Sequence, residues 1–179
     1  MFLELIRERR SIRKYESKPI EAEKLDLLVE AFLRAPTSMG KNPWEFVVVT
    51  DRDLLTKLSS AKPHGAGFLK GAAAGIVVCA DPEVSDVWVE DASIASTFIH
   101  LAAASLELGS CWIQIRKRPH DDTRSAGRYI AELLDLPDRL SVLSVVAVGY
   151  PAEHKAGHPA EKLKYDKVKH NRYAAPYRP

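Results

Sequence analysis

The sequence has few cysteines. Its 179 residues contain two, Cys79 and Cys111, and each stands inside an apolar run. Small secreted domains that depend on disulfides carry more cysteines, in regular spacings. We therefore expect both thiols to be reduced and buried, which indicates a cytoplasmic protein.

Long hydrophobic runs are also missing. The most apolar stretch, residues 94–108, is interrupted by polar residues such as His100 and Glu107. It is too short and too polar to cross a bilayer. Residues 1–8 carry charges where a secretion signal would have its apolar core. We expect no membrane segment and no secretion signal.

The sequence lacks an excess of charge of one sign. Lys and Arg number 26 against 24 Asp and Glu, which gives a formal net charge of +2. Nucleic-acid-binding proteins concentrate positive charge, so the composition gives no reason to expect a nucleic-acid partner. No repeat, linker or low-complexity segment divides the chain. Residues 1–179 are therefore expected to form one domain, long enough to bury a core.

Hydrophobic periodicity predicts alternating helices and strands. Helices are expected over residues 2–8, from about 22 to Ala35, after the capping residue Asp51, over 87–108 and around 129–134; strands are expected over 46–49, 76–80, 111–115 and 143–148. In the first helix Phe2, Leu5 and Ile6 should face inward, and Gly109 should end the longest helix. Such alternation predicts a layered sandwich of helices and strands, but it does not give the strand directions.

The composition changes after Pro151. Residues 152–179 are polar, rich in lysine and without clear periodicity. Tyr165, Tyr173 and Tyr177 are spaced along this tail, and aromatic side chains are enriched where a segment lies on another protein. We expect the tail to pack on a partner subunit.

A basic run, Arg9-Arg10-Ser11-Ile12-Arg13-Lys14, lies near the N-terminus. Guanidinium groups bind phosphate oxygens in pairs, and a serine hydroxyl adds a neutral hydrogen bond. In an extended backbone the side chains of Ser11 and Arg13 point the same way and can hold one phosphate. Taken alone, the run is explained better by a solvated charged surface.

A polar loop, residues 35–44, follows the second helix. Thr37, Ser38 and Asn42 supply donors and acceptors that suit the edge of a heteroaromatic ring. A capped turn followed by a core tryptophan, Trp44, explains the same residues equally well.

Three other sequence patterns give weaker evidence of a functional site. The glycines of residues 65–75 precede a strand, whereas a dinucleotide-binding loop follows one. His154 and His158 have the spacing of metal ligands but no matching cysteine or carboxylate partners. Cys111 has no neighbouring base that would make it a nucleophile. We therefore expect no metal site and no catalytic side chain.

Together, several segments resemble the nitroreductase family of flavin mononucleotide (FMN)-dependent oxidoreductases. They occur in the family's order and span nearly the whole chain: residues 9–15, Ala35-Pro36-Thr37, Asn42-Pro43-Trp44, Asp91-Ala92-Ser93, residues 108–113 and 148–151. The resemblance implies an α+β fold, a three-layer sandwich with a mixed central sheet flanked by helices and an extended C-terminal tail. It also implies a homodimer with flavins at the interface.

The resemblance also implies the flavin contacts. The phosphate would be held by Arg9, Arg10, Ser11 and Arg13, completed from the tail by Lys162 or Lys164. The flavin ring would lie against a loop of the other subunit, with Pro36, Thr37, Ser38, Met39 and Asn42, and against a strand with Cys111, Trp112, Ile113 and Gln114. Asn42 and Gln114 depart from the family pattern near the expected substrate cavity, so they weaken any inference about the substrate.

The implied activity is a two-step reaction. NADH or NADPH reduces bound FMN, which then reduces a nitroaromatic, a quinone or a similar planar acceptor. The cofactor supplies this chemistry, so no side-chain nucleophile is needed. Two alternatives remain open: a flavin-binding redox sensor or flavin store, and a flavin-modifying or dehalogenating enzyme on the same fold.

Overall fold

The computed structural model describes residues 2–177, so residue 1 and residues 178–179 of the expected domain lie outside the described part. The helices and strands follow the order α1 Phe2–Glu8, α2 Ala22–Leu33, β1 Trp44–Val49, α3 Arg52–Ser59, β2 Ala74–Ala80, α4 Trp88–Ser105, β3 Gly109–Gln114, α5 Ala126–Leu133 and β4 Ser141–Gly149. Short 3₁₀ helices occur at Ser38–Gly40, Gly67–Gly71, Ala160–Lys162 and Tyr165–Lys167.

The four strands form one sheet in the order β1-β2-β4-β3, and every neighbouring pair is antiparallel. All four expected strands are confirmed. A mixture of strand directions is expected from the resemblance, but among residues 2–177 the parallel pairing is limited to one isolated bridge, between Ser11 and Ser110. Periodicity gives no strand direction here, because helices cover both faces of the sheet and antiparallel strands then form continuous apolar runs, as parallel strands do.

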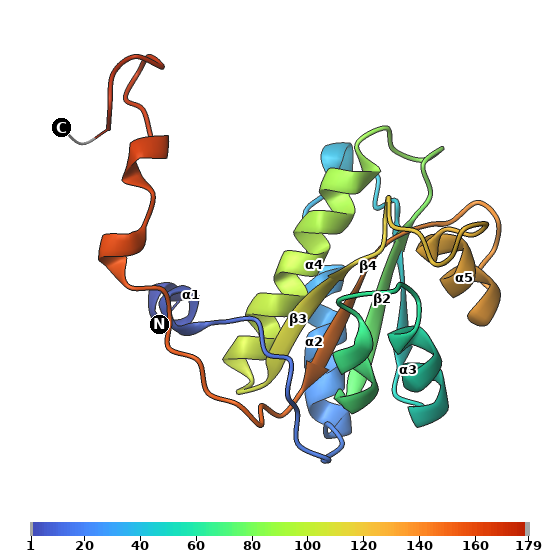
Figure 1. Ribbon diagram of the computed structural model, residues 1–179. Coiled ribbons are helices and arrows are strands. Elements are labelled where there is room, and N and C mark those ends of the chain that lie inside the picture. The colour runs from blue at the N-terminus through green and yellow to red at the C-terminus, as the bar shows by residue number, and fades with distance from the viewer. Residues whose placement is uncertain (1, 178–179) are drawn as a thin grey trace.

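Helices cover both faces of the sheet, which confirms the three-layer sandwich (Figure 1). α2 and α4 pack on one face, with Leu28, Phe32 and Ile99 fully or almost fully buried. α3, α5 and the 3₁₀ helix Gly67–Gly71 pack on the other face. A row of apolar side chains crosses all four strands on that second face: Val47, Val77, Val145 and Ile113.

Two local expectations are wrong. α1 buries none of its residues, and Phe2 and Ile6 are 63% and 44% exposed. Its apolar residues therefore do not belong to the core of this chain. α4 ends at Ser105 rather than at Gly109, because Glu107 takes the left-handed backbone conformation, with a φ of 62°, that usually falls to a glycine at this position.

Gly109 instead begins β3 and allows a close approach of the basic run. The backbone N–H of Ile12 donates a 3.0 Å hydrogen bond to the carbonyl of Ser110. A Cβ atom on Gly109 would lie 2.8 Å from the Cβ of Ile12. The absence of a side chain at residue 109 therefore sets how closely the Arg9–Arg13 segment lies against the sheet edge.

The first residues of the tail hold the basic run from its other side. The backbone N–H of Ala152 donates to the carbonyl of Lys14, at 2.9 Å. One carboxylate oxygen of Glu153 accepts from the backbone N–H of Arg13 at 2.6 Å and from Lys155 Nζ at 2.8 Å. The Lys155 ammonium first, and the Arg13 N–H next, lower the pKa of Glu153 from 4.5 to about 2.

Beyond this contact the tail leaves the body of the molecule. It passes α1 so closely that a Cβ atom on Gly157 would collide with the carbonyl of Arg7. Its two 3₁₀ helices then extend away from the sandwich (Figure 1). Leu163, Val168 and Tyr173 are 49%, 43% and 89% exposed. The tail therefore contributes little to the core of its own chain.

Gly109→Ala is expected to weaken folding, because the new methyl group must displace Ile12. Overpacking of this kind costs about 1–3 kcal/mol of unfolding free energy. The measurement is urea unfolding followed by circular dichroism. Gly71→Ala is the control, since nothing lies within 4 Å of its added Cβ. Equal stability of the two variants would contradict the close approach at Gly109.

Glu153→Gln is expected to lower stability at neutral pH but not in acid. Because folding lowers the pKa of Glu153, its stabilisation is complete above pH 4.5 and is lost as the pH falls toward 2. The difference in unfolding free energy between wild type and variant should therefore narrow across that interval. Exposed Glu83 supplies the control, Glu83→Gln. A difference that stays constant down to pH 2 would refute the assigned pKa shift.

Candidate functional site

A cavity of about 260 Å³ lies at the outer edge of β3, and most of the side chains that line it are arginine or lysine. Its lining residues are Arg9, Arg10, Ser11, Arg13, Lys155 and His158. The four residues expected from the N-terminal run are thus brought together. A concave site with several guanidinium groups, an ammonium and a hydroxyl has the donor set that binds a phosphate group.

The extended backbone of the basic run explains its arrangement. Ile12 points into the protein and is 8% exposed, whereas Ser11 and Arg13 on either side of it line the cavity. The Arg13 guanidinium lies 5.7 Å from the ring centre of Phe68, in cation–π contact. Arg10 donates from Nη1 to the carbonyl of Ala156. The alternation of an extended strand therefore points Ser11 and Arg13 toward the cavity. The Phe68 ring holds Arg13 and the Ala156 carbonyl holds Arg10.

Lys155 and His158 are the lining residues that sequence reasoning missed. Lys155 Nζ donates to the carbonyl of Ser11, at 3.1 Å, as well as to Glu153. Lys162 and Lys164, the expected phosphate ligands, are exposed on the tail and do not line this cavity. The tail has no periodicity, so the only signal for Lys155 was its nearness in sequence to the end of β4.

A larger cavity of about 890 Å³ lies beside the first and shares Arg9, Arg10 and Lys155 with it. His100 of α4 lines it, and its Nδ1 lies 2.7 Å from Ser110 Oγ. Burial first, and the charge of Arg9 next, lower the pKa of His100 to about 4. At neutral pH the imidazole is therefore uncharged.

The side chains of β3 alternate between the two faces of the sheet. Cys111 is buried on the side of Arg13, and Ile113 packs into the core with α3 and α5. Trp112 faces the layer of α2 and α4, and its Nε1 donates to Gln114 Oε1 at 2.9 Å. The expected flavin-lining strand therefore presents Cys111 and Ile113 on one face and Trp112 and Gln114 on the other.

The two buried cysteines are free thiols. Burial raises the pKa of Cys111, and it raises the pKa of Cys79 to about 12. Both thiols are therefore protonated at neutral pH and unsuited to nucleophilic attack. Among residues 2–177 no group of three or more His, Cys, Asp or Glu side chains is placed to hold a metal ion. Within the same range no helix has the length and apolar character needed to cross a membrane.

The loop after α2 lies at the other end of the molecule from the cations. Pro36, Ser38, Met39 and Asn42 are exposed and Thr37 is half-buried, and none of them lines either cavity. Ser38 donates its backbone N–H to buried Asp91, at the start of α4, at 2.8 Å. Within one chain the structure therefore does not bring this loop to the cation-lined cavity.

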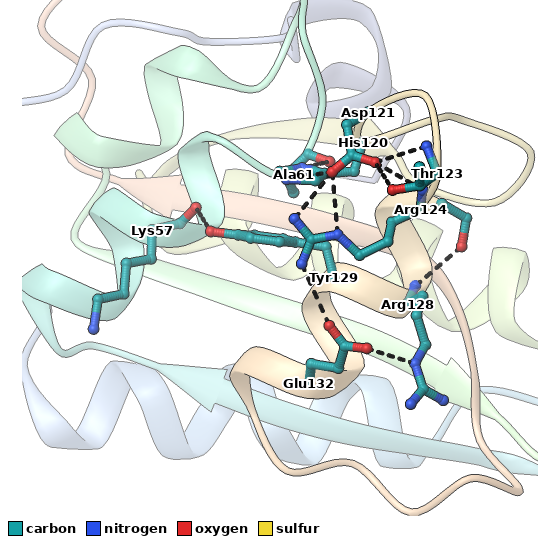
Figure 2. Close-up of polar contacts among 10 residues, drawn as sticks. Lys57, Ala61, His120, Asp121, Thr123, Arg124, Arg128, Tyr129 and Glu132 are labelled. Atoms are coloured by element: carbon teal, nitrogen blue, oxygen red, sulfur yellow. Dashed lines mark hydrogen bonds and ion pairs between the residues drawn. The ribbon is translucent and has the colours of Figure 1, made fainter.

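A second polar network lies around His120 and Tyr129 (Figure 2). His120 Nδ1 lies 3.1 Å from the carbonyl of Ala61, and its ring stacks on Tyr129 with 4.0 Å between ring centres. The Tyr129 hydroxyl donates to the carbonyl of Lys57, at 3.1 Å. These contacts tie α5 and the preceding loop to the end of α3.

Comparisons with known proteins identify the family of this chain. A profile of the nitroreductase family matches residues 6–63 and 59–150. A solved FMN-dependent nitroreductase from Clostridium difficile R20291 is 45% identical, with a TM-score of 0.94, and the match covers 96% of this chain and 99% of that one. A relative from Archaeoglobus fulgidus named "Putative NADH dehydrogenase/NAD(P)H nitroreductase" is 40% identical, over 89% of this chain and 90% of its own length.

A third similar protein has its ligand in place. A crystal structure described as "a putative nitroreductase in complex with fmn", from Desulfovibrio desulfuricans, is 27% identical, with a TM-score of 0.76, and covers 96% of this chain and 97% of that one. The family profile spans most of the sandwich, and the first two relatives match almost the whole chain. The chain belongs to the nitroreductase family.

Proposed function

We propose that this protein is an FMN-dependent NAD(P)H oxidoreductase that reduces a nitroaromatic, a quinone or a similar planar acceptor. The observation that carries the proposal is the cavity lined by Arg9, Arg10, Ser11 and Arg13. Its volume of about 260 Å³ and its cationic donors suit the phosphate of FMN. Similar proteins named for FMN and NAD(P)H support the cofactor and the electron donor.

In the proposed complex the cations anchor the phosphate. Lys155 and His158 complete the cavity from the tail in this chain, while Lys162 and Lys164 remain candidates for the same role. The strand of Cys111, Trp112, Ile113 and Gln114 lines one side of the flavin ring with its free edge, since its side chains point to the two faces of the sheet. Phe68 supports Arg13 on the inner side, at 5.7 Å. The residues thus bind and orient the cofactor, and FMN when bound supplies the two-electron chemistry.

We propose that the active form is a homodimer, and that the tail of residues 152–179 packs on the partner subunit. The exposed apolar residues of α1 and the tail support this assignment, because Phe2, Leu163 and Tyr173 have no place in the core of their own chain. The contact would leave the loop of Pro36, Thr37, Ser38, Met39 and Asn42 beside the partner's flavin. The free, buried state of both cysteines supports a cytoplasmic location.

The direct test of the function is a spectrum followed by a titration. The protein loaded with FMN should be yellow, and NADH or NADPH should bleach the flavin absorbance under anaerobic conditions. Adding a quinone or a nitroaromatic should then restore the colour. A yellow protein that neither nicotinamide reduces would favour a flavin store or sensor. A protein that does not take up FMN would overturn the proposal.

Arg13→Ala should weaken the binding of FMN more than that of riboflavin, because its contact is with the phosphate. Loss of a charge-assisted hydrogen bond costs about 1.5–3 kcal/mol, or about tenfold to a hundredfold in affinity. Both ligands are titrated by flavin fluorescence. Arg34→Ala is the control, since Arg34 is an exposed arginine at the C-terminal cap of α2 and is paired with Glu30. Equal losses for FMN and riboflavin would show that Arg13 does not bind phosphate.

A further inference from the structure

Asp91 is a buried carboxylate that joins two loops. It lies in the first turn of α4 and is 2% exposed. One carboxylate oxygen accepts the backbone N–H of Ser38 at 2.8 Å, and the other accepts the hydroxyl of Ser85 at 3.0 Å. Taking a charge out of water is costly unless hydrogen bonds compensate for it. Both oxygens of Asp91 have such bonds.

The loop that Asp91 holds is strained. Met39 and Asn42 have φ angles of 53° and 48°, in the left-handed region that non-glycine residues rarely occupy. Such conformations persist where the surroundings impose them. The Thr37 hydroxyl donates to Asn42 Oδ1 at 2.9 Å and accepts the Asn42 N–H at 3.1 Å, which closes the loop on itself. The bond from Ser38 to Asp91 fixes this closed loop to the sandwich.

The loop is also presented outward. Met39 is 89% exposed at its tip. We propose that Asp91 is a positioning residue, which holds the loop Thr37–Asn42 in the shape that contacts the flavin bound to a second copy of the chain. This inference rests on the proposed function. It adds a residue that does not itself touch the cofactor and acts through Ser38.

The length of α4 explains why the loop contacts the flavin of the other copy and not that of its own chain. Asp91 lies at the N-terminal end of this helix, while Ala104 and Ser105 at its C-terminal end line a cavity with Arg9 and Arg10. An α-helix of 18 residues is about 27 Å long. Figure 1 shows the basic segment passing beside β3 toward the end of α4 that lies away from the loop. The loop and the cations of one chain are therefore far apart.

A two-fold axis perpendicular to α4 brings the loop of one copy close to the cations of the other. When two copies pair with their α4 helices antiparallel, the N-terminal end of one helix meets the C-terminal end of the other. Along α4, Glu90, Ile94 and Thr97 are exposed at helical spacing, and Ile94 is 38% exposed. That side of the helix is available for such a contact. The loop held by Asp91 then reaches the cations of the second copy.

An effect of Asp91 on helix stability alone is the competing explanation. A negative charge in the first turn of a helix stabilises the helix dipole. Asp91→Asn separates the two roles, because the amide removes the charge but keeps an oxygen that accepts the Ser38 N–H. If Asp91 positions the loop, Asp91→Asn should retain most of the FMN affinity. Asp91→Ala should then lose about tenfold to a hundredfold in affinity.

The decisive experiment uses mixed dimers. Asp91→Ala and Arg13→Ala chains carrying different affinity tags are refolded together, and the heterodimer is isolated through both tags. One of its two sites then combines both defects, while the other combines an intact cation cluster with an intact loop. FMN is titrated by fluorescence quenching against both homodimers.

The expected result is one tight FMN site per heterodimer and none in either variant homodimer. A heterodimer without a tight site would overturn the inference, as would an Asp91→Ala homodimer that binds FMN like wild type. Asp51→Ala controls for lost stability, because Asp51 caps α3 by accepting the Leu54 N–H and does not contact the loop. If Asp51→Ala lost as much FMN affinity as Asp91→Ala, the inference about Asp91 would also be overturned. In each case tight, reducible FMN in the wild type would leave the proposed function standing.

Discussion

The hydrogen bond from the Ile12 N–H to the Ser110 carbonyl is the contact on which the cation-lined cavity depends. It lays an otherwise irregular segment along the edge strand β3, at a distance that only a glycine at residue 109 permits. Strand-like alternation then turns Ile12 inward and leaves Ser11 and Arg13 facing the cavity. The same geometry brings the start of the tail, through Glu153 and Lys155, to the opposite side of the segment.

Charge explains why this region suits an anion. Three arginines, a lysine and a histidine line the cavity. The nearby carboxylate, Glu153, is engaged by the backbone N–H of Arg13 and by Lys155, and its pKa of about 2 keeps it ionised. His100 beneath Arg9 stays neutral because it is buried. A phosphate group that enters the cavity therefore meets Arg10 and Lys155 held by backbone carbonyls and Arg13 held by the Phe68 ring. Because these side chains are already ordered, less ordering is needed on binding.

The sequence predicted the layers better than it predicted the contacts between distant segments. Apolar runs identified all four strands, and the cap at Asp51 placed α3, because these features are local. Periodicity reports burial and carries no strand direction, so the antiparallel sheet was not predicted. The inward face assigned to α1 was wrong, because an amphipathic helix has the same pattern whether it covers its own core or another surface.

The candidate site shows the same limit. The basic run was found because its cations are adjacent in sequence, but Lys155 and His158 come from a tail without periodicity. Asp91 belongs to a segment that resembles the family, Asp91-Ala92-Ser93, but the sequence assigns it no role, because its bond to Ser38 spans 53 positions of sequence. Residues that act through such long-range contacts leave no local signal.

The central claim is that a phosphate group anchors the cofactor. The most direct measurement is a side-by-side titration of the wild-type protein, freed of flavin, with FMN and with riboflavin, followed by quenching of flavin fluorescence. The two ligands share the ring and the ribityl chain and differ in the phosphate. The account predicts that FMN binds at least about a hundredfold more tightly, since several charge-assisted hydrogen bonds are gained. Equal affinity for the two ligands would contradict it.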